Sequence, residues 1–198
     1  MTDTQKKPLW KNELVWLFLI TSGLFAILYS KFILGGYAYV FTDTGADTMQ
    51  INYAQYGLFS SLFRSGESGY VLQAGLGMDV SSYYPAYLIP YNLLILLAPQ
   101  RLLPWAVLAS AYLKMITISL VGYLFYRKLM QDGIGTMAAA LAWTFSGYVI
   151  LWGQHYGFCT CMALFTVFMY FLQCYLNGEQ RWKSAGLVIT VTMLLISS

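Results

Sequence analysis

The sequence has few charged residues, few cysteines and a single histidine. Only 10% of its 198 residues are charged, whereas a soluble domain carries roughly 25% charged residues. This shortage excludes an ordinary water-soluble domain and predicts a membrane protein, in agreement with 59% hydrophobic residues and a mean hydropathy of +0.59. There is no run of basic residues, so nucleic acid is not an expected partner.

The three cysteines, Cys159, Cys161 and Cys174, lie in one apolar stretch. A disulfide framework requires an even number of cysteines in loops, so we expect these residues to be buried as small hydrophobic side chains. The i, i+4 spacing of His155 and Cys159 leaves metal binding as an alternative.

Four windows meet or nearly meet the length needed to cross a bilayer, which is about 20 apolar residues at about 1.5 Å each. They are 14–33, 105–126, 135–152 and 158–176, and a fifth apolar window, 185–198, runs to the end of the sequence. We therefore expect the N-terminal part of one transmembrane domain of a longer protein. The run after Lys11 is too long for a signal peptide and has no cleavage motif, so it predicts an uncleaved first span.

A further apolar segment, Tyr83–Pro99, contains prolines at 85, 90 and 99 and predicts a re-entrant or interfacial element. If this segment does not cross the membrane, the basic residues of the other loops all lie on the same side. The positive-inside rule identifies that side as the cytoplasm. Those residues are Lys6, Lys7, Lys11, Arg127, Lys128, Arg181 and Lys183. The prediction is a multi-pass, all-α protein of a bacterial cytoplasmic membrane, with a cytoplasmic N-terminus and an external loop over about 35–104.

The external loop contains its own helical pattern and half of the eight acidic residues. Met49, Tyr53, Tyr56, Phe59 and Phe63 recur at helical spacing. This pattern predicts a juxtamembrane helix that lies along the membrane surface with its apolar face down.

Asp43 and Asp47 precede that helix and are candidates for catalysis or metal binding. Asp47 with Gln50 also fits a variant of the helix capping box, and Asp43 also fits a solvated turn. Asp79, after "GLGM", is expected to be a turn or cap residue.

The order of the motifs resembles that of the bacterial YfhO family of polytopic membrane proteins, over nearly the whole chain. The resemblance rests on "DTMQINYAQY", "GLGMD", "YYPAYLIPYNLLILLAP", "YLKMITISLVGYLFYRKL" and "AWTFSGYVILWGQHYGF". That family is similar to the GT-C class of glycosyltransferases. The resemblance implies a GT-C-like bundle that transfers a sugar from a polyprenyl-phosphate donor to an envelope polymer such as teichoic acid, outside the cytoplasmic membrane.

The resemblance also implies an essential acid in the first external loop, which matches Asp47, with Asp43 as the second candidate. Lys114, His155 and Arg101 are candidates for binding the donor phosphate. Each has a simpler interpretation: Lys114 as a structural lysine inside the bundle, His155 as a turn residue and Arg101 as a headgroup-level anchor. The sequence leaves the cofactor unknown, and a divalent metal held by Asp43 and Asp47 is the candidate.

Two other classes of protein remain open at this point. A transporter or flippase for a lipid-linked substrate would concentrate polar groups inside its spans, where this sequence has only Lys114 at depth. A non-catalytic envelope assembly subunit would depend on neither aspartate. A fragment that lacks the later spans is expected to be inactive by itself.

Overall fold

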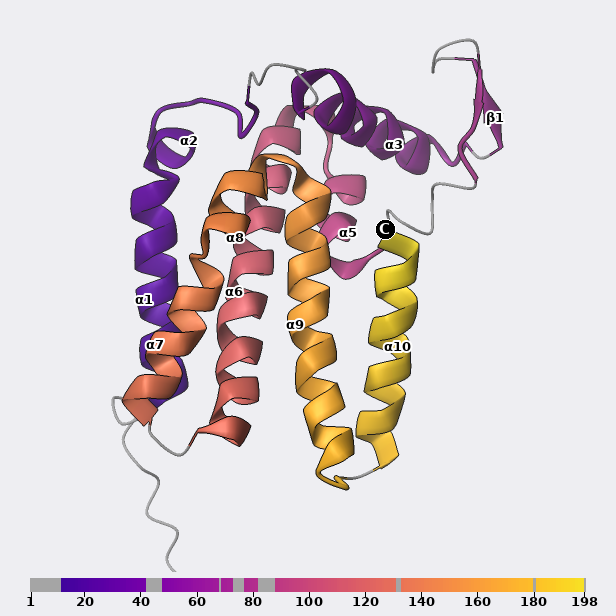
Figure 1. The fold of residues 1–198 in the computed structure, drawn as a ribbon. Helices are drawn as coiled ribbons and strands as arrows, with labels where there is room; N and C mark the ends of the chain where they lie inside the picture. The colour runs from indigo at the N-terminus through magenta and orange to yellow at the C-terminus, as the bar shows by residue number, and fades with distance from the viewer. Residues whose placement is uncertain are drawn as a thin grey trace, which may run out of the picture.

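The computed structural model describes residues 12–41, 48–67, 69–72, 77–81, 88–130, 133–179 and 181–197. These residues form a mostly helical bundle with a smaller group of elements across one of its ends (Figure 1). The helices that run along the bundle are α1 (Glu13–Leu28), α6 (Leu103–Leu129), α7 (Gly133–Thr144), α9 (Tyr156–Leu176) and α10 (Arg181–Ser197).

Three stretches of the described chain are long and apolar enough to cross a membrane: Gln100–Leu129, Gly133–Gln154 and Tyr156–Leu176. They coincide with three of the predicted windows and confirm a membrane protein with transmembrane helices. The first and fifth windows also form helices, but α1 has 16 residues and α10 has 17. Beyond Tyr29 the chain continues from α1 into the short helix α2 (Ser30–Leu34).

The second of these long stretches is interrupted. After α7 the chain leaves the helix at Phe145 and Ser146, resumes as α8 (Gly147–Leu151) and ends in the 3₁₀ turn η4 (Trp152–Gln154). Ser146 adopts an extended backbone, with φ −61° and ψ 154°, which no α-helix accommodates. The predicted span 135–152 is therefore two helices joined by a break.

The upper end of the bundle in Figure 1 is the end at which α9 begins, and the other end is called the lower end. The elements at the upper end include the π-helix η2 (Thr48–Tyr53), α3 (Ala54–Ser65), α5 (Pro90–Leu97) and the 3₁₀ turn η3 (Gln100–Leu102). A two-stranded antiparallel ribbon, β1 (Tyr70–Val71) with β2 (Met78–Asp79), pairs Tyr70 with Asp79. Figure 1 shows α3 lying across the upper end.

The predicted surface helix is confirmed as a helix, but its buried face differs from the predicted one. Tyr56, Phe59 and Leu62 are buried, whereas Met49 and Phe63, at the two ends of the predicted stripe, are exposed. A π-helix closes its hydrogen bonds at i+5, so it turns less per residue than an α-helix. The η2 turn therefore shifts the register of the stripe before α3 begins.

The segment with three prolines contains only one described helix, α5, which begins at Pro90 and has eight residues. Eight residues of α-helix cover about 12 Å, far less than the roughly 30 Å hydrocarbon core. This helix packs against α3 and α6. Its length supports the prediction that the segment does not cross.

At the centre of the bundle lies α6, which packs against α1, α5, α7 and α9, while α10 packs on the outside of α9. Polar side chains join the helices inside the bundle. Thr21 of α1 and Ser119 of α6 share a buried hydrogen bond of 2.7 Å, and the indole of Trp143 donates to Thr166 at 3.0 Å. None of the three cysteines, all of which are described, forms a disulfide bond. Cys159 and Cys174 are buried as predicted, whereas Cys161 is half-buried.

Candidate functional site

Asp43 and Asp47, the predicted catalytic acids, lie outside the described residues. Thr48, the first residue of η2, is fully buried, and its hydroxyl donates to the carbonyl oxygen of Gln154 at 3.3 Å. Gln154 immediately precedes His155 and the start of α9. The start of η2 therefore packs against the turn that carries His155.

Three buried tyrosines, Tyr39, Tyr56 and Tyr156, form a layer just inside the upper end, which we call the tyrosine layer. The rings of Tyr56 and Tyr156 stack with centroids 5.4 Å apart, and those of Tyr39 and Tyr156 lie 5.8 Å apart. The Tyr156 hydroxyl donates to the Tyr39 carbonyl, and the Tyr56 hydroxyl donates to Asn92 at 3.4 Å. The layer thus joins α9 to the chain after α2 and to α3 and α5.

The tyrosines at this end act as hydrogen-bond donors. Burial raises the pKa of Tyr39 far above its ordinary value of 10, and the neighbouring Tyr29 raises it further. Burial also raises the pKa of the half-buried Tyr53 in η2. These phenols therefore stay protonated and donate hydrogen bonds.

Lys114 lies directly beneath this layer and is only 2% exposed. Its Nζ donates to the Tyr156 carbonyl at 3.1 Å, an oxygen that also accepts from the Thr160 hydroxyl at 3.2 Å. Helical side chains lean toward the N-terminus of their helix, so Lys114 of α6 extends toward the upper end. Its ammonium therefore lies at the level of the first turn of α9.

His155 and Arg101 lie outside this buried site. The His155 ring packs against Trp152 and Phe158, each with centroids 5.6 Å away, in a cluster whose other two rings are well exposed. Arg101, in η3, is exposed. About 17 Å of helix separates the start of α6 at Leu103 from Lys114, so one phosphate group cannot contact Arg101 and Lys114 together.

Asp79 fills the turn role predicted for it. Its carboxylate accepts hydrogen bonds from the Ser81 hydroxyl at 2.6 Å and from the Ser81 backbone N–H at 3.0 Å. These two bonds lower the pKa of Asp79, the hydroxyl having the larger effect. Within the described ranges, no group of three His, Cys, Asp or Glu side chains is arranged to hold a metal ion.

The sequence interpretation missed two serines whose hydroxyls are buried without a hydrogen-bond partner, Ser110 and Ser146. Ser110 lies one helical turn before Lys114 on the same face of α6. The i, i+4 spacing of a hydroxyl and a cation inside a predicted span is a signal that could have identified it. Ser146 lies in the break between α7 and α8, and the sequence around it contains no comparable spacing of a hydroxyl and a charge.

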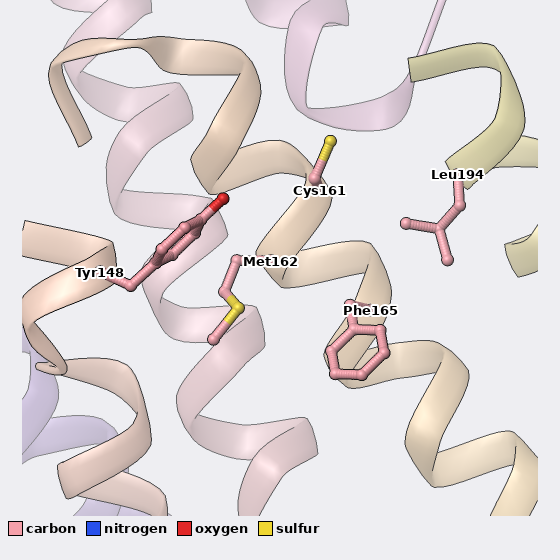
Figure 2. A pocket seen from close by; sticks show the side chains of 5 residues that line it. All are labelled: Tyr148, Cys161, Met162, Phe165 and Leu194. Carbon is pink, nitrogen blue, oxygen red and sulfur yellow. The ribbon is translucent and has the colours of Figure 1, made fainter. Parts of the chain in front are cut away.

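Two hollows lie near these groups. A groove of about 390 Å³ between α8, α9 and α10 is lined by Tyr148, Cys161, Met162, Phe165 and Leu194 (Figure 2). A smaller hollow of about 140 Å³ lies where the chain after α2 meets the start of α6, beside Tyr37 and Trp105. The groove is apolar apart from the Tyr148 hydroxyl and the Cys161 thiol.

Comparisons with protein-family models, with curated proteins and with solved structures find no match for this chain. The site therefore has to be interpreted from its own chemistry. It contains a buried cation, an unpartnered hydroxyl and a layer of phenols, next to the turn that Thr48 contacts.

Proposed function

We propose that the full-length protein is a membrane glycosyltransferase of the GT-C type, within the YfhO family that its motifs resemble. The observation that carries the proposal is the buried ammonium of Lys114 beneath the tyrosine layer, next to the turn that binds Thr48. A cation withdrawn from water at the membrane surface suits a substrate that brings a negative charge to that level. A polyprenyl-phosphate sugar is such a substrate.

In the proposed reaction, Asp47 is the general base, and Asp43 is the second candidate for this role. The acceptor hydroxyl loses its proton to the carboxylate, and its oxygen forms the new bond to the anomeric carbon of the sugar. The bond between that carbon and the phosphate oxygen breaks, and the electron pair leaves with the polyprenyl phosphate. Lys114 stabilises the charge on the leaving phosphate by electrostatic attraction.

In the remaining parts of the proposal, the orientation follows from the positions of the basic residues and the acceptor follows from the family resemblance. The upper end faces the outside of a bacterial cytoplasmic membrane, the N-terminus is cytoplasmic, and the acceptor is an envelope polymer such as teichoic acid. His155 and Arg101, at the surface of the upper end, bind the donor headgroup as it approaches, and they do so separately from Lys114.

The test is sugar transfer by the full-length protein in liposomes that contain labelled polyprenyl-phosphate sugar and an acceptor polymer. We expect Asp47→Asn to lower the rate about 10²–10⁴-fold, the usual contribution of general-base catalysis. Asp79→Asn is the matched control, because the Asp79 carboxylate is accounted for by Ser81, and it should keep the wild-type rate. A wild-type rate in Asp47→Asn would remove this assignment, and Asp43→Asn would then be measured.

A second candidate function is the movement of a lipid-linked substrate across the membrane. The observation that favours it is the break at Phe145 and Ser146 within an apolar stretch, because discontinuous helices often line substrate paths in transporters. The Ser146 hydroxyl is buried without a hydrogen-bond partner. Tyr148, in the next helix α8, lines the apolar groove. Transbilayer movement of the carrier without sugar transfer, in the same liposomes, would select this function.

A further inference from the structure

Two polar side chains on one buried face of α6 have hydrogen-bond donors that lack an acceptor in the described part of the chain. Ser110 is 1% exposed, and its hydroxyl has no hydrogen-bond partner. Lys114 is 2% exposed, and across the described part of the chain its ammonium has one acceptor, the Tyr156 carbonyl. An ammonium carries three donor hydrogens, so two remain. Buried donors without acceptors are rare in folded proteins and indicate an unseen partner.

The positions of the two groups make them neighbours. Residues at i and i+4 lie on one face of a helix with their Cβ atoms about 5–6 Å apart, and both side chains lean toward the N-terminus of α6. Ser110 and Lys114 therefore point toward the level at which α9 begins. At this level the apolar stretch Gly133–Gln154 ends and Tyr156–Leu176 begins.

The charge of Lys114 is also left without compensation. The described carboxylates that form ion pairs are Glu13, which lies near Arg127, and Glu179, which pairs with Lys128 and Lys183. The side chains that act electrostatically on Lys114 are Cys159 and Cys161 of α9, and no described carboxylate is among them. A bound water would satisfy the spare donors but would leave the buried charge uncompensated.

We propose that Lys114 and Ser110 form a buried subsite for the phosphate of a polyprenyl carrier lipid, an inference that rests on the proposed function. Two ammonium hydrogens and one hydroxyl hydrogen match the several acceptor oxygens of a phosphate group. The ammonium supplies the opposite charge. Ser110 thereby becomes a binding residue, which the sequence motifs do not mark.

Two hydrogen bonds join η2 and α3 to the elements around the subsite. The bond from Thr48 to Gln154 is 3.3 Å and the bond from Tyr56 to Asn92 is 3.4 Å, both at the weak end of the range. Thr48 opens the π-helix η2, a rare form that is frequent at functional sites.

The experiment measures binding of polyprenyl phosphate to the full-length protein in nanodiscs, with polyprenol as the matched ligand that lacks only the phosphate. Binding is followed by the rise in melting temperature with ligand concentration, and each variant is first melted without ligand to establish that it folds. The nanodiscs are made of lipids without net charge. In a parallel set of measurements, phosphatidylglycerol replaces polyprenyl phosphate as the added ligand.

We expect the wild-type protein to bind polyprenyl phosphate in preference to polyprenol. Lys114→Met should weaken phosphate binding about 30-fold and Ser110→Ala about 10-fold, the loss expected for hydrogen bonds to a charged group. Lys128→Met and Thr192→Val, a lysine and a span hydroxyl elsewhere in the bundle, should leave the affinity within about twofold of wild type.

The outcomes separate the subsite from the proposed function. A preference for the phosphate that survives in Lys114→Met, or no preference in the wild-type protein, overturns the subsite even if sugar transfer is observed. Equal stabilisation by phosphatidylglycerol overturns its assignment to the carrier lipid. A preference that Lys114→Met abolishes, in a protein that transfers no sugar, upholds the subsite and rejects the glycosyltransferase.

Discussion

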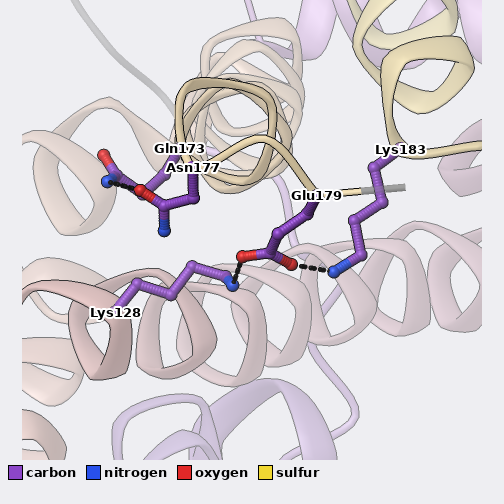
Figure 3. Close-up of polar contacts among 5 residues, drawn as sticks. All are labelled: Lys128, Gln173, Asn177, Glu179 and Lys183. Atoms are coloured by element: carbon purple, nitrogen blue, oxygen red, sulfur yellow. Dashed lines mark hydrogen bonds and ion pairs between the residues drawn. The ribbon is translucent and has the colours of Figure 1, made fainter. Parts of the chain in front are cut away.

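The two ends of the bundle use polar residues in different ways. At the lower end every described carboxylate of α1 and of the α9–α10 turn has a partner. Glu13 accepts from the Tyr123 hydroxyl and lies 3.9 Å from Arg127. Glu179 accepts hydrogen bonds from Lys128 of α6 and Lys183 of α10, so one carboxylate in the α9–α10 turn links these two helices (Figure 3).

Just inside the upper end the tyrosine layer supplies phenol groups, and the buried cation Lys114 has no described counter-charge. The tyrosine layer is buried, whereas the carboxylates of the lower end are partly exposed. Ion pairs between partly exposed side chains keep part of their hydration, so forming them costs little desolvation free energy. A buried cation without a counter-ion costs stability, so its retention favours a role in binding over a role in folding.

The largest expected effect concerns the tyrosine layer. Tyr156→Ala removes a ring that packs against Tyr39 and Tyr56 and leaves a cavity, which should lower the free energy of unfolding by about 3–5 kcal/mol. Tyr156→Phe keeps the ring and should cost only about 1 kcal/mol for the lost hydrogen bond. Unfolding in mixed detergent micelles measures both. A cost below about 1 kcal/mol for Tyr156→Ala would mean that the layer does not hold the upper end together.

A smaller effect of the opposite sign is expected at Lys114. Lys114→Met keeps the length of the side chain and removes a buried charge, so the free energy of unfolding without ligand should rise by about 1–2 kcal/mol. The Tyr156 carbonyl keeps its bond from Thr160 in this variant. The measurement is the same micelle titration, with Lys128→Met as the control from the lower end. A clear loss of stability in Lys114→Met would show that the lysine is structural.

The smallest effect is the pH dependence of the lower end. Hydrogen bonds from Lys128 and Lys183 lower the pKa of Glu179 from 4.5 to about 2. The folded protein therefore holds this carboxylate ionised more strongly than the unfolded chain does. Its contribution to stability is complete above about pH 4.5 and is lost as the pH falls through about 2.

The comparison variant for this prediction is Glu179→Gln, which cannot titrate. Melting curves between pH 6 and pH 2, in the same detergent, should show a smaller decrease in stability for Glu179→Gln than for the wild-type protein. The same dependence in both proteins would mean that the ion pairs of Figure 3 contribute nothing to stability.

Part of this fold could be predicted from the sequence because the signal is local. The apolar windows 105–126 and 158–176 correspond closely to α6 and α9, since a run of apolar residues is sufficient to identify a spanning helix. The break at Phe145 and Ser146 was not predicted. The residues around it contain no proline, and the Ser146–Gly147 dipeptide is a weak turn signal inside a mainly apolar window.

Single residues of the candidate site could be predicted from the sequence, but which of them lie together in the fold could not. Lys114 stands out in any span because a charge there is costly. Its partner Tyr156 and its neighbour Ser110 do not stand out, because tyrosine and serine are common in membrane helices and at their ends. The separation of Arg101 from Lys114 follows from the length of α6 between them, which the predicted window already contained.

The sequence by itself determined that the chain is apolar, helical and membrane-embedded, because transfer from water to lipid depends on composition within each segment. The tertiary structure alone decided which side chains meet. Tyr156 reaches Tyr39 across 117 positions of sequence and Lys114 across 42. Such contacts depend on how each helix is rotated and where it is broken, and these properties are set by the packing of the helices against one another.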